Sequence, residues 1–266
     1  MPLSQAPEPQ LQGVPTGGEL PAGALFSGPA RYRAITPWGP VEASAMTLVA
    51  AGGPAIVAAP IVYALAWGGF EVGEMSLASP AVLGLMAGTQ LLSIFLIWLL
   101  AGRANMRPDV LQYRQAPLSL AGCLLAGLLI VVLTGLLEFG LHKVVGFDPF
   151  SETKVLIEGL RSPYWLGTVV VAVVLAPLWE ELAFRGFLLT ALAKTRLGIV
   201  GAGLICNSVW TAMHLQYSPS GLASVFLAGA LLTWIVWRTA SMRAAIVAHA
   251  IVNATSLAFL AVMSPA

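Results

Sequence analysis

Seven long runs of apolar residues follow one another along the chain, separated by short polar segments. A helix needs about 20 apolar residues to cross the hydrocarbon core of a bilayer, and all but the sixth run approach or exceed that length. Lipid favours helices because the backbone must satisfy its own hydrogen bonds. The pattern predicts an all-α, polytopic transmembrane helical bundle of about seven spans. The runs are 45–67, 80–101, 118–141, 164–193, 197–215, 221–237 and 242–263.

Two segments near the middle of the chain depart from this simple pattern. The run 164–193 is longer than one span, and Pro177 lies near its centre. Proline removes a helical hydrogen bond, so the sequence predicts a kink there. The segment "SETKVLIEGLRSP", residues 151–163, predicts a short helix at the membrane interface.

The composition agrees with a membrane protein. Hydrophobic residues make up 58% of the chain and charged residues 9%, with a mean hydropathy of +0.85. Soluble domains are about 45–50% apolar and about 25% charged, so the composition argues against a soluble globular enzyme. A net charge of +1 gives no reason to expect a nucleic-acid partner. Cys123 and Cys206 each lie inside an apolar run, and we interpret both as small core hydrophobes.

The chain divides into three regions. Residues 1–40 hold eight of the 18 prolines and six glycines, which predicts a disordered tail. No apolar stretch follows a basic start, which argues against a signal peptide. Residues 41–160 form the N-terminal membrane helices, and residues 161–266 form a second membrane region.

Basic residues alternate between the two sides of the predicted membrane region. Counted over alternate flanks, Lys and Arg total ten on the side of the N-terminus and three on the other. The positive-inside tendency then predicts a cytoplasmic N-terminus. Arg outnumbers Lys ten to three, and Ala, Gly and Pro are abundant. This composition favours a bacterial source, and hence an integral, multi-pass protein of the plasma membrane.

Charged residues embedded in the long fourth run are the clearest functional signal. Ionisable groups at membrane depth are costly and mark functional sites by default. In "APLWEELAFRG", residues 176–186, Glu181 and Arg185 are four apart and share a helical face. We expect them to pair and to serve mainly in packing. Glu180 projects about 100° away, so it is left to act on another group.

Two further polar groups follow helical spacing: Asn207, Trp210 and His214 in the fifth run, and His249 with Asn253 in the seventh. The helical rise puts Glu180 and His214 both roughly 22–27 Å from the turn between their runs, so we expect them to meet at one level. His249 agrees less well with that depth, unless the turn before its run is drawn into the protein. A single neutral histidine here would only indicate hydrogen bonding between helices. Because a carboxylate, two imidazoles and amide side chains occur together on three runs of one half of the chain, we favour a functional site.

Together these groups resemble the motifs of the CPBP family, which includes CAAX proteases and bacteriocin-processing enzymes. The family is also called the ABI or type II CAAX prenyl endopeptidase family. "EELAFRG" resembles E-E-x-x-x-R, "WTAMH" resembles F-x-x-x-H with Trp in place of Phe, and "HAIVN" resembles H-x-x-x-N. The motifs occur in the family's order on separate runs and cover about residues 160–260. We therefore interpret residues 161–266 as a CPBP-like catalytic membrane core.

The resemblance implies an intramembrane endopeptidase. Peptide hydrolysis needs a base that activates water and donors that stabilise the oxyanion. Glu180 is the implied base, and His214 holds or orients the water. His249 and Asn253 donate to the oxyanion. The implied catalytic set is Glu180, His214, His249 and Asn253, supported by Glu181, Arg185, Trp210 and Asn207.

The residues leave the cofactor open. Glu180, His214 and His249 would be the ligands if a catalytic zinc is bound. No H-E-x-x-H helix is present, and ligation would occupy the carboxylate that must act as base. We slightly favour a metal-free mechanism.

Other classes of function compete with the protease. A proton-coupled transporter would use the same ionisable groups as a relay, although they cluster in one place and do not line a route. A non-catalytic membrane scaffold or immunity protein would not need them ionisable. The expected partners are the lipid bilayer and a membrane-associated peptide or protein. A bacterial source disfavours prenylated substrates, and the substrate's identity and the oligomeric state stay open.

Overall fold

The computed structural model describes residues 18–67, 77–113, 117–146 and 153–263, and these are mainly helical. In this part of the chain no strand occurs; an isolated bridge joins Leu20 and Leu118. The longer helices are α1 (Pro40–Trp67), α2 (Pro80–Ala101), α4 (Leu120–Val145), α10 (Gly198–Ala212), α11 (Pro219–Thr239) and α12 (Met242–Met263). The short α-helices are α3 (Arg107–Val110), α6 (Lys154–Arg161), α7 (Trp165–Val169), α8 (Ala176–Glu180) and α9 (Leu189–Ala193). Two 3₁₀ helices, η1 (Ala22–Leu25) and η2 (Arg103–Asn105), and two π-helices, η3 (Val170–Leu175) and η4 (Glu181–Leu188), complete the set for these residues.

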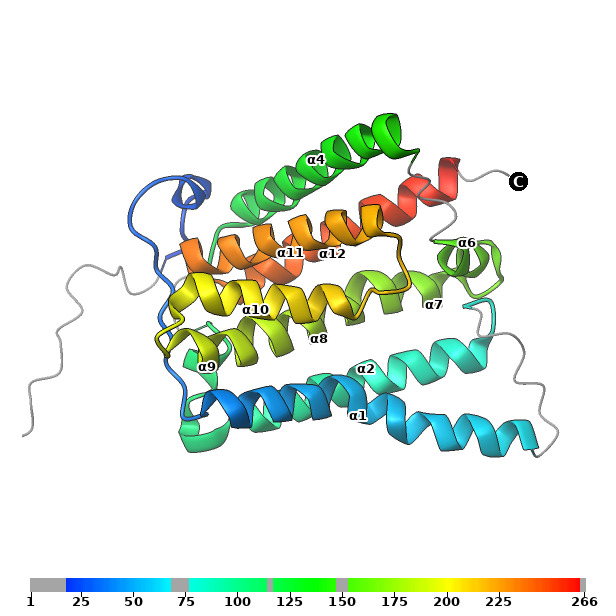
Figure 1. The fold of residues 1–266 in the computed structure, drawn as a ribbon, viewed down its shortest axis with the longest axis horizontal. Helices are drawn as coiled ribbons and strands as arrows, with labels where there is room; N and C mark the ends of the chain where they lie inside the picture. Colours follow the sequence, from blue (N-terminus) through cyan, green and yellow to red (C-terminus); the bar gives the residue numbers. More distant parts are fainter. Residues whose placement is uncertain (1–17, 68–76, 114–116, 147–152, 264–266) are drawn as a thin grey trace, which may run out of the picture.

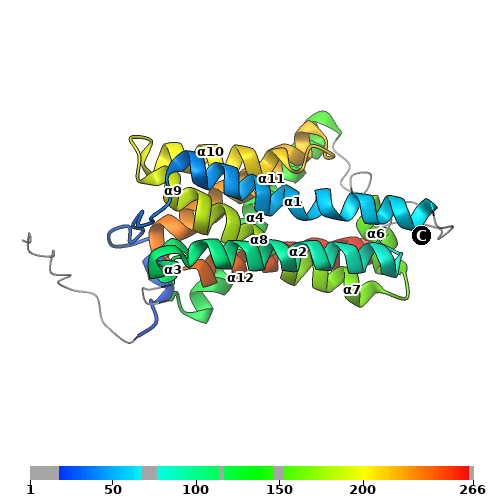
Figure 2. The same ribbon diagram turned by 90° about the horizontal axis from the view of Figure 1, so that it is seen from below.

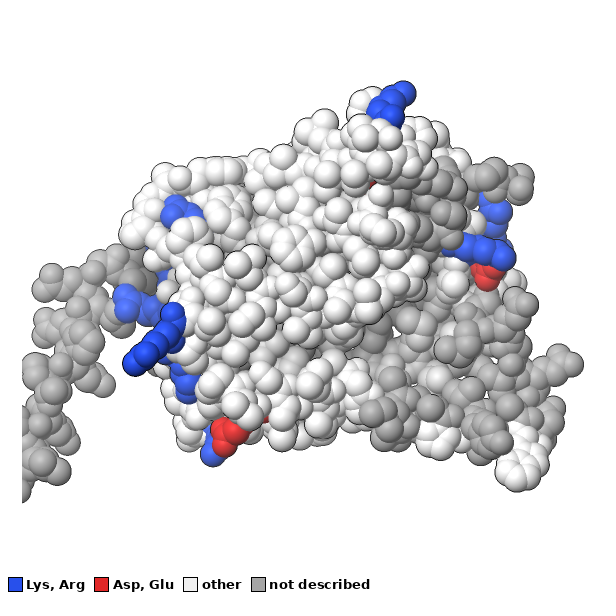
Figure 3. All heavy atoms as spheres, viewed as in Figure 1, with Lys and Arg blue, Asp and Glu red and all other residues white. Residues whose placement is uncertain are grey.

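The predicted polytopic helical bundle is confirmed, and each of the seven apolar runs coincides with a helical segment. Among the described residues, five stretches are long and apolar enough to cross a membrane: α2, α4, the stretch Trp165–Ala193, α11 and α12. α10 is apolar but has only 15 residues, whereas α1 has 28. Figure 3 shows charged side chains at the two ends of one face, with a broad uncharged band between them. Such a band is what a bilayer requires.

The helices run up and down between two ends of the bundle (Figure 1). The connections from α2 to α4, from α9 to α10 and from α11 to α12 lie at the end where α1 begins. The stretch from α7 to α9 lies inside the bundle, and its segment η4 contacts α1, α2, α10 and α12. α1 and α2 lie on one side of this stretch in Figure 1, and they lie in front of it in Figure 2, which is seen from below. The embedded charges are therefore carried by the innermost segment.

The described N-terminal segment packs on the end of the bundle where α1 begins, although we expected residues 1–40 to be a disordered tail. Leu25 in η1 is fully buried, and backbone hydrogen bonds join Leu20 to residues 117 and 119. Arg238 donates to three backbone carbonyls of the segment: those of Leu25, Ser27 and Gly28. Contacts between an arginine and backbone carbonyls leave no pattern in a sequence, so composition alone missed them. Residues 1–17 lie outside the described part of the chain.

The turn at residues 240–241 enters the protein. Ser241 is 3% exposed, and its hydroxyl accepts a hydrogen bond from the backbone N–H of Leu118 at 3.3 Å. The turn is therefore covered by the segment before α4, at the end of the bundle where α1 begins. His249 itself reaches the level of the glutamates, since its Nδ1 lies 2.8 Å from Oε1 of Glu181.

The predicted short helix of residues 151–163 is present as α6, at the end of the bundle where α7 begins (Figure 1). Its Gly159 faces α7 at very short range. A Cβ at this position would lie 2.6 Å from Oγ1 of Thr168 and 2.7 Å from Cβ of Leu77. Only glycine allows α6 to lie this close, so α6 is fixed against the start of the central stretch.

Candidate active site

The central stretch contains π-helical turns on both sides of Glu180. Within η3 the N–H of Ala176 donates to the carbonyl of Val171, five residues earlier. Pro177 follows and has no N–H, so the next carbonyl in this pattern, that of Ala172, loses its helical donor. The irregularity predicted at Pro177 is therefore a π-turn. Such turns are frequent at functional sites.

Glu181 and Arg185 form the predicted pair. Nη1 of Arg185 lies 3.0 Å from Oε1 of Glu181, and both side chains are 0% exposed. Nη2 of Arg185 donates to the carbonyl of Gly229 in α11 at 3.2 Å. Among the described residues, Oε2 of Glu181 and Nε of Arg185 are buried without a hydrogen-bond partner. Such a pair is poorly optimised for stability, which is consistent with a role in a site.

His249 bridges the two glutamates. Its Nδ1 lies 2.8 Å from Oε1 of Glu181, and its Nε2 lies 4.0 Å from Oε2 of Glu180. An ionised carboxylate only accepts hydrogen bonds, so Nδ1 must carry a hydrogen. Glu181 therefore fixes the tautomer and the orientation of the ring, and Nε2 faces Glu180.

Trp210 makes the shortest contact to Glu180. Its indole Nε1 donates to Oε2 of Glu180 at 2.6 Å, while the guanidinium of Arg185 lies 4.5 Å from the centre of its ring. The motif analysis assigned Trp210 only a supporting role, as a residue close in size to Phe. The sequence shows that a tryptophan is present, but it does not show which group accepts the indole N–H. The acceptor depends on how α8 and α10 pack.

His214 lies at the edge of this group. α10 ends at Ala212, so His214 sits on the following turn and its Nδ1 is 3.0 Å from the carbonyl of Trp210. Its ring centre is 5.0 Å from that of Trp210. No hydrogen bond or ion pair in the described residues joins His214 to Glu180, and Trp210 contacts both. Glu180 and His214 therefore make no direct contact in this structure, and the side chain of Trp210 links them.

Asn253 joins α12 to the central stretch. Its Nδ2 donates to the carbonyl of Ala172 at 2.8 Å, the same carbonyl that Pro177 leaves without a helical donor. The amide thus satisfies a buried backbone group, which would otherwise be costly. One of its two N–H hydrogens is used in this way, and the second remains for another acceptor.

Asn207 supports the packing of α10 against α11. Its Nδ2 donates to the carbonyl of Phe226 at 2.9 Å. A Cβ added at Gly229 would lie 1.8 Å from Oδ1 of Asn207 and 2.7 Å from ring carbons of Trp210. Only glycine fits there, so Gly229 fixes the distance between these helices. The sequence did not single out Gly229.

The donor atoms of the possible zinc set do not converge in this structure. Within the described residues, no group of three or more His, Cys, Asp or Glu side chains is arranged to hold a metal ion. Nδ1 of His249 faces Glu181 and Nδ1 of His214 faces a backbone carbonyl, which leaves Nε2 of each ring as the nitrogen that could bind a metal. As arranged, these residues do not fit a three-ligand zinc site.

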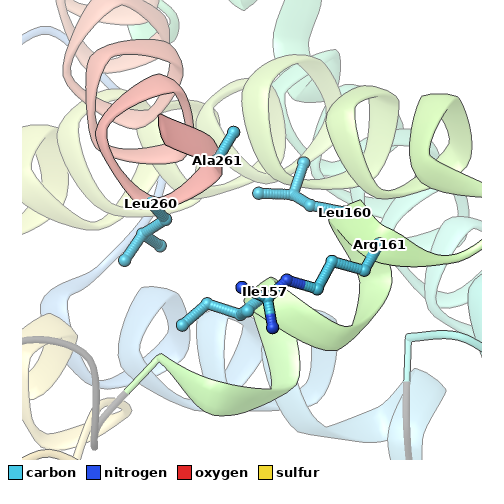
Figure 4. A pocket seen from close by; sticks show the side chains of 5 residues that line it. All are labelled: Ile157, Leu160, Arg161, Leu260 and Ala261. Atoms are coloured by element: carbon cyan, nitrogen blue, oxygen red, sulfur yellow. The ribbon is translucent and has the colours of Figure 1, made fainter. Parts of the chain in front are cut away.

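A cavity of about 70 Å³ lies apart from these residues, between α6 and α12 (Figure 4). Its lining consists of Ile157, Leu160, Arg161, Leu260 and Ala261. None of the candidate catalytic residues reaches it.

The region that contains the candidate site matches a known family. Residues 162–255 match the family model described as type II CAAX prenyl endopeptidase Rce1-like. The match covers all eight residues that the sequence assigned to the site, and it confirms the resemblance. No curated protein and no solved structure matches the chain.

Proposed function

Because residues 162–255 form a type II CAAX prenyl endopeptidase Rce1-like region, we propose that the protein is an intramembrane endopeptidase. It hydrolyses a peptide bond of a membrane-associated protein or peptide. The observation that carries the proposal is the division of labour between two adjacent glutamates. Arg185 neutralises Glu181, whereas no Lys or Arg among the described residues pairs with Glu180. A carboxylate at membrane depth without a Lys or Arg partner is expensive and marks function.

Glu180 is the base in this proposal. Its Oε2 accepts from Trp210, and its Oε1 makes no hydrogen bond to any residue that the structure describes. Oε1 takes a proton from water while the water oxygen attacks the carbonyl carbon of the scissile bond. The carboxylic acid then returns this proton to the departing amine, so the base is regenerated.

His249 stabilises the negative oxygen of the intermediate. Since its Nδ1 hydrogen is directed to Glu181, Nε2 can donate only when the ring is protonated. The donor in this step is therefore the imidazolium form of His249, which lies between the two glutamates.

His214 and Asn253 complete the site from its edges. Asn253 offers its second amide hydrogen as a further donor to the oxyanion, while the first holds Ala172. His214 stands on the turn beyond α10, where it orients the water or the substrate. Asn207, which bonds within the α10–α11 contact, acts only on packing.

The reaction in this proposal needs no metal. We expect protein purified without a histidine tag to hold sub-stoichiometric metal and to keep its activity at pH 7 after treatment with a strong chelator. The arrangement of His214, Glu180 and His249 supports this expectation, because no three ligand side chains among the described residues are arranged to hold a metal ion. Near-equimolar zinc by elemental analysis would contradict it, if the H214A and H249A variants lost zinc together with activity.

The proposed orientation has the end where α1 begins in the cytoplasm of a bacterial plasma membrane. The supporting observation is the distribution of Lys and Arg, because cytoplasmic flanks carry an excess of them. On the proposed cytoplasmic side the described residues include Arg31, Arg33, Arg103, Arg107, Lys194, Arg196, Arg238 and Arg243. On the opposite side they include Lys143, Lys154 and Arg161.

The decisive experiment compares wild type with E180Q on a library of membrane-anchored, fluorogenic peptides. Loss of a general base lowers the rate by about 10²–10⁴-fold, and the variant should remain folded. E158Q is the matched control, because Glu158 lies in α6 and pairs with Lys154. Retained activity in purified E180Q would exclude Glu180 as the base. Proton-coupled flux in vesicles without cleavage would indicate a transporter, and the absence of both would indicate a scaffold.

A further inference from the structure

We propose that Trp210 is a positioning residue of this site, whose indole N–H holds Oε2 of Glu180 and thereby leaves Oε1 as the atom that meets water. The inference rests on the proposed function and assigns to one further side chain a definite task in it. It concerns the N–H group, which phenylalanine lacks at the same position.

The indole ring is held firmly enough to do this. Trp210 is 3% exposed, and the guanidinium of Arg185 covers its face at 4.5 Å. The rings of His214 and His249 meet it edge-on, with centres 5.0 Å and 5.6 Å away. Neighbours on several sides of the ring restrict its rotation. The direction of its N–H is therefore set by packing.

Among the described residues, the indole of Trp210 and the imidazole of His249 both lie closest to the same oxygen of Glu180, Oε2. Nε1 of Trp210 is 2.6 Å from Oε2, and Nε2 of His249 is 4.0 Å from it. A hydrogen bond from N–H to a carboxylate is short and strong, so Oε2 stays with the indole. Without this donor, the carboxylate can turn toward His249 and form an ion pair. That movement would take Oε1 away from the water.

A second buried tryptophan supplies the control. Trp179 precedes Glu180 in α8, is 7% exposed, and packs on Phe184 with ring centres 6.2 Å apart. Its indole N–H donates to no residue that the structure describes. Trp179 and Trp210 thus share size, burial and proximity to Glu180, and they differ in whether the N–H has an acceptor.

The first test replaces each tryptophan by 3-benzothienylalanine, which keeps the two fused rings and exchanges N–H for sulfur. At position 210 we expect kcat to fall roughly 10–100-fold with KM within about twofold, because one charge-assisted hydrogen bond is lost. W210F should show the same loss of kcat. At position 179 both values should stay within about twofold of wild type. Full kcat with the sulfur isostere at position 210 would overturn the proposal, since packing alone would then suffice.

The second test does not depend on activity. The chain has eight tryptophans, and ¹⁵N labelling of their indoles gives one N–H signal for each in detergent micelles. The signal that W210F removes belongs to Trp210. In E180A this signal should shift further than that of Trp179, because it loses its acceptor. An unmoved Trp210 signal would disprove the hydrogen bond. If wild type cleaves no peptide but the signal moves, the bond stands and the proposed function fails.

Discussion

A proline inside a helix frees a backbone carbonyl in each half of the bundle, and in each half a side chain from another helix binds it. In the first half the proline is Pro54 of α1. With α-helical spacing it cannot donate to the carbonyl of Ala50. The hydroxyl of Ser93 in α2 donates to that carbonyl at 2.7 Å instead. No charged residue occurs within α2, so this contact only holds two helices together.

In the second half the same arrangement lies beside the charges. Pro177 frees the carbonyl of Ala172 with π-helical spacing, and Asn253 of α12 binds it at 2.8 Å. One turn before Asn253, His249 contacts Glu181. The two halves therefore differ in the residues that surround the side chain bound to the freed carbonyl: uncharged residues in the first half and charged ones in the second. Loss of a hydrogen bond between membrane helices costs about 0.6 kcal/mol on average, whereas removing one partner of a buried ion pair strands a charge and costs about 3–5 kcal/mol.

The largest effect should come from removing a charge in the second half. R185A strands Glu181, whose side chain is 0% exposed, and the expected loss is about 3–5 kcal/mol of unfolding free energy. Denaturant unfolding of the protein in detergent measures it. The double variant E181Q/R185M removes both charges and should recover part of the loss. Additive losses in the double variant would show that the two side chains do not interact.

A close contact without charge should give the next largest effect. In G229A the new Cβ would lie 1.8 Å from Oδ1 of Asn207, so the side chains of α10 that face Gly229, or the helices themselves, must shift. Forced repacking of this kind costs about 1–3 kcal/mol. G84A in α2 is the matched control, because no atom lies within 4 Å of a Cβ there. Thermal unfolding of both variants compares the halves, and equal midpoints would refute the close packing at Gly229.

Apolar runs and helical spacing were enough to predict the bundle and much of the site. Each apolar run coincides with a helical segment among the described residues, since burial in lipid leaves few other structures. The four-residue spacing predicted the contact between Glu181 and Arg185, because it depends on one helix only. The fold of residues 18–39 was missed, since backbone carbonyls bind Arg238 there and carry no sequence information.

Contacts between side chains on different helices could not be predicted from the sequence. Trp210 could be seen as a tryptophan in a phenylalanine position, but its acceptor Glu180 follows from the packing of α8 on α10. The expected depth of His249 depended on the position of the turn before α12, which no sequence pattern indicates. Pro177 signalled an irregular helix, yet the partner of the freed carbonyl, Asn253, lies 81 residues from Ala172. Such pairings arise from packing, which helical period alone does not determine.

A smaller effect is expected where the proline contact meets the site. N253A removes one hydrogen bond to a buried carbonyl and should cost about 1 kcal/mol. P177A restores an N–H that can donate to Ala172, so N253A should cost less in the P177A background. Unfolding free energies of the four proteins in this cycle give the coupling. A coupling of zero would mean that Pro177 and Asn253 do not share the carbonyl.

The smallest effect belongs to the matching contact in the first half. S93A removes one hydrogen bond between helices, and such bonds contribute about 0.6 kcal/mol on average in membrane proteins. P54A returns an N–H to Ala50 and should cancel most of this loss, as in the other cycle.

The single variants S93A and N253A should differ in their effect on peptidase activity. S93A should retain peptidase activity within about twofold of wild type, because Ser93 binds only Ala50 and its own helix. N253A should lose far more, because Asn253 also serves the oxyanion in the proposed mechanism. If both variants lost activity equally while remaining folded, Asn253 would act only by joining helices, and its place among the catalytic residues would have to be withdrawn.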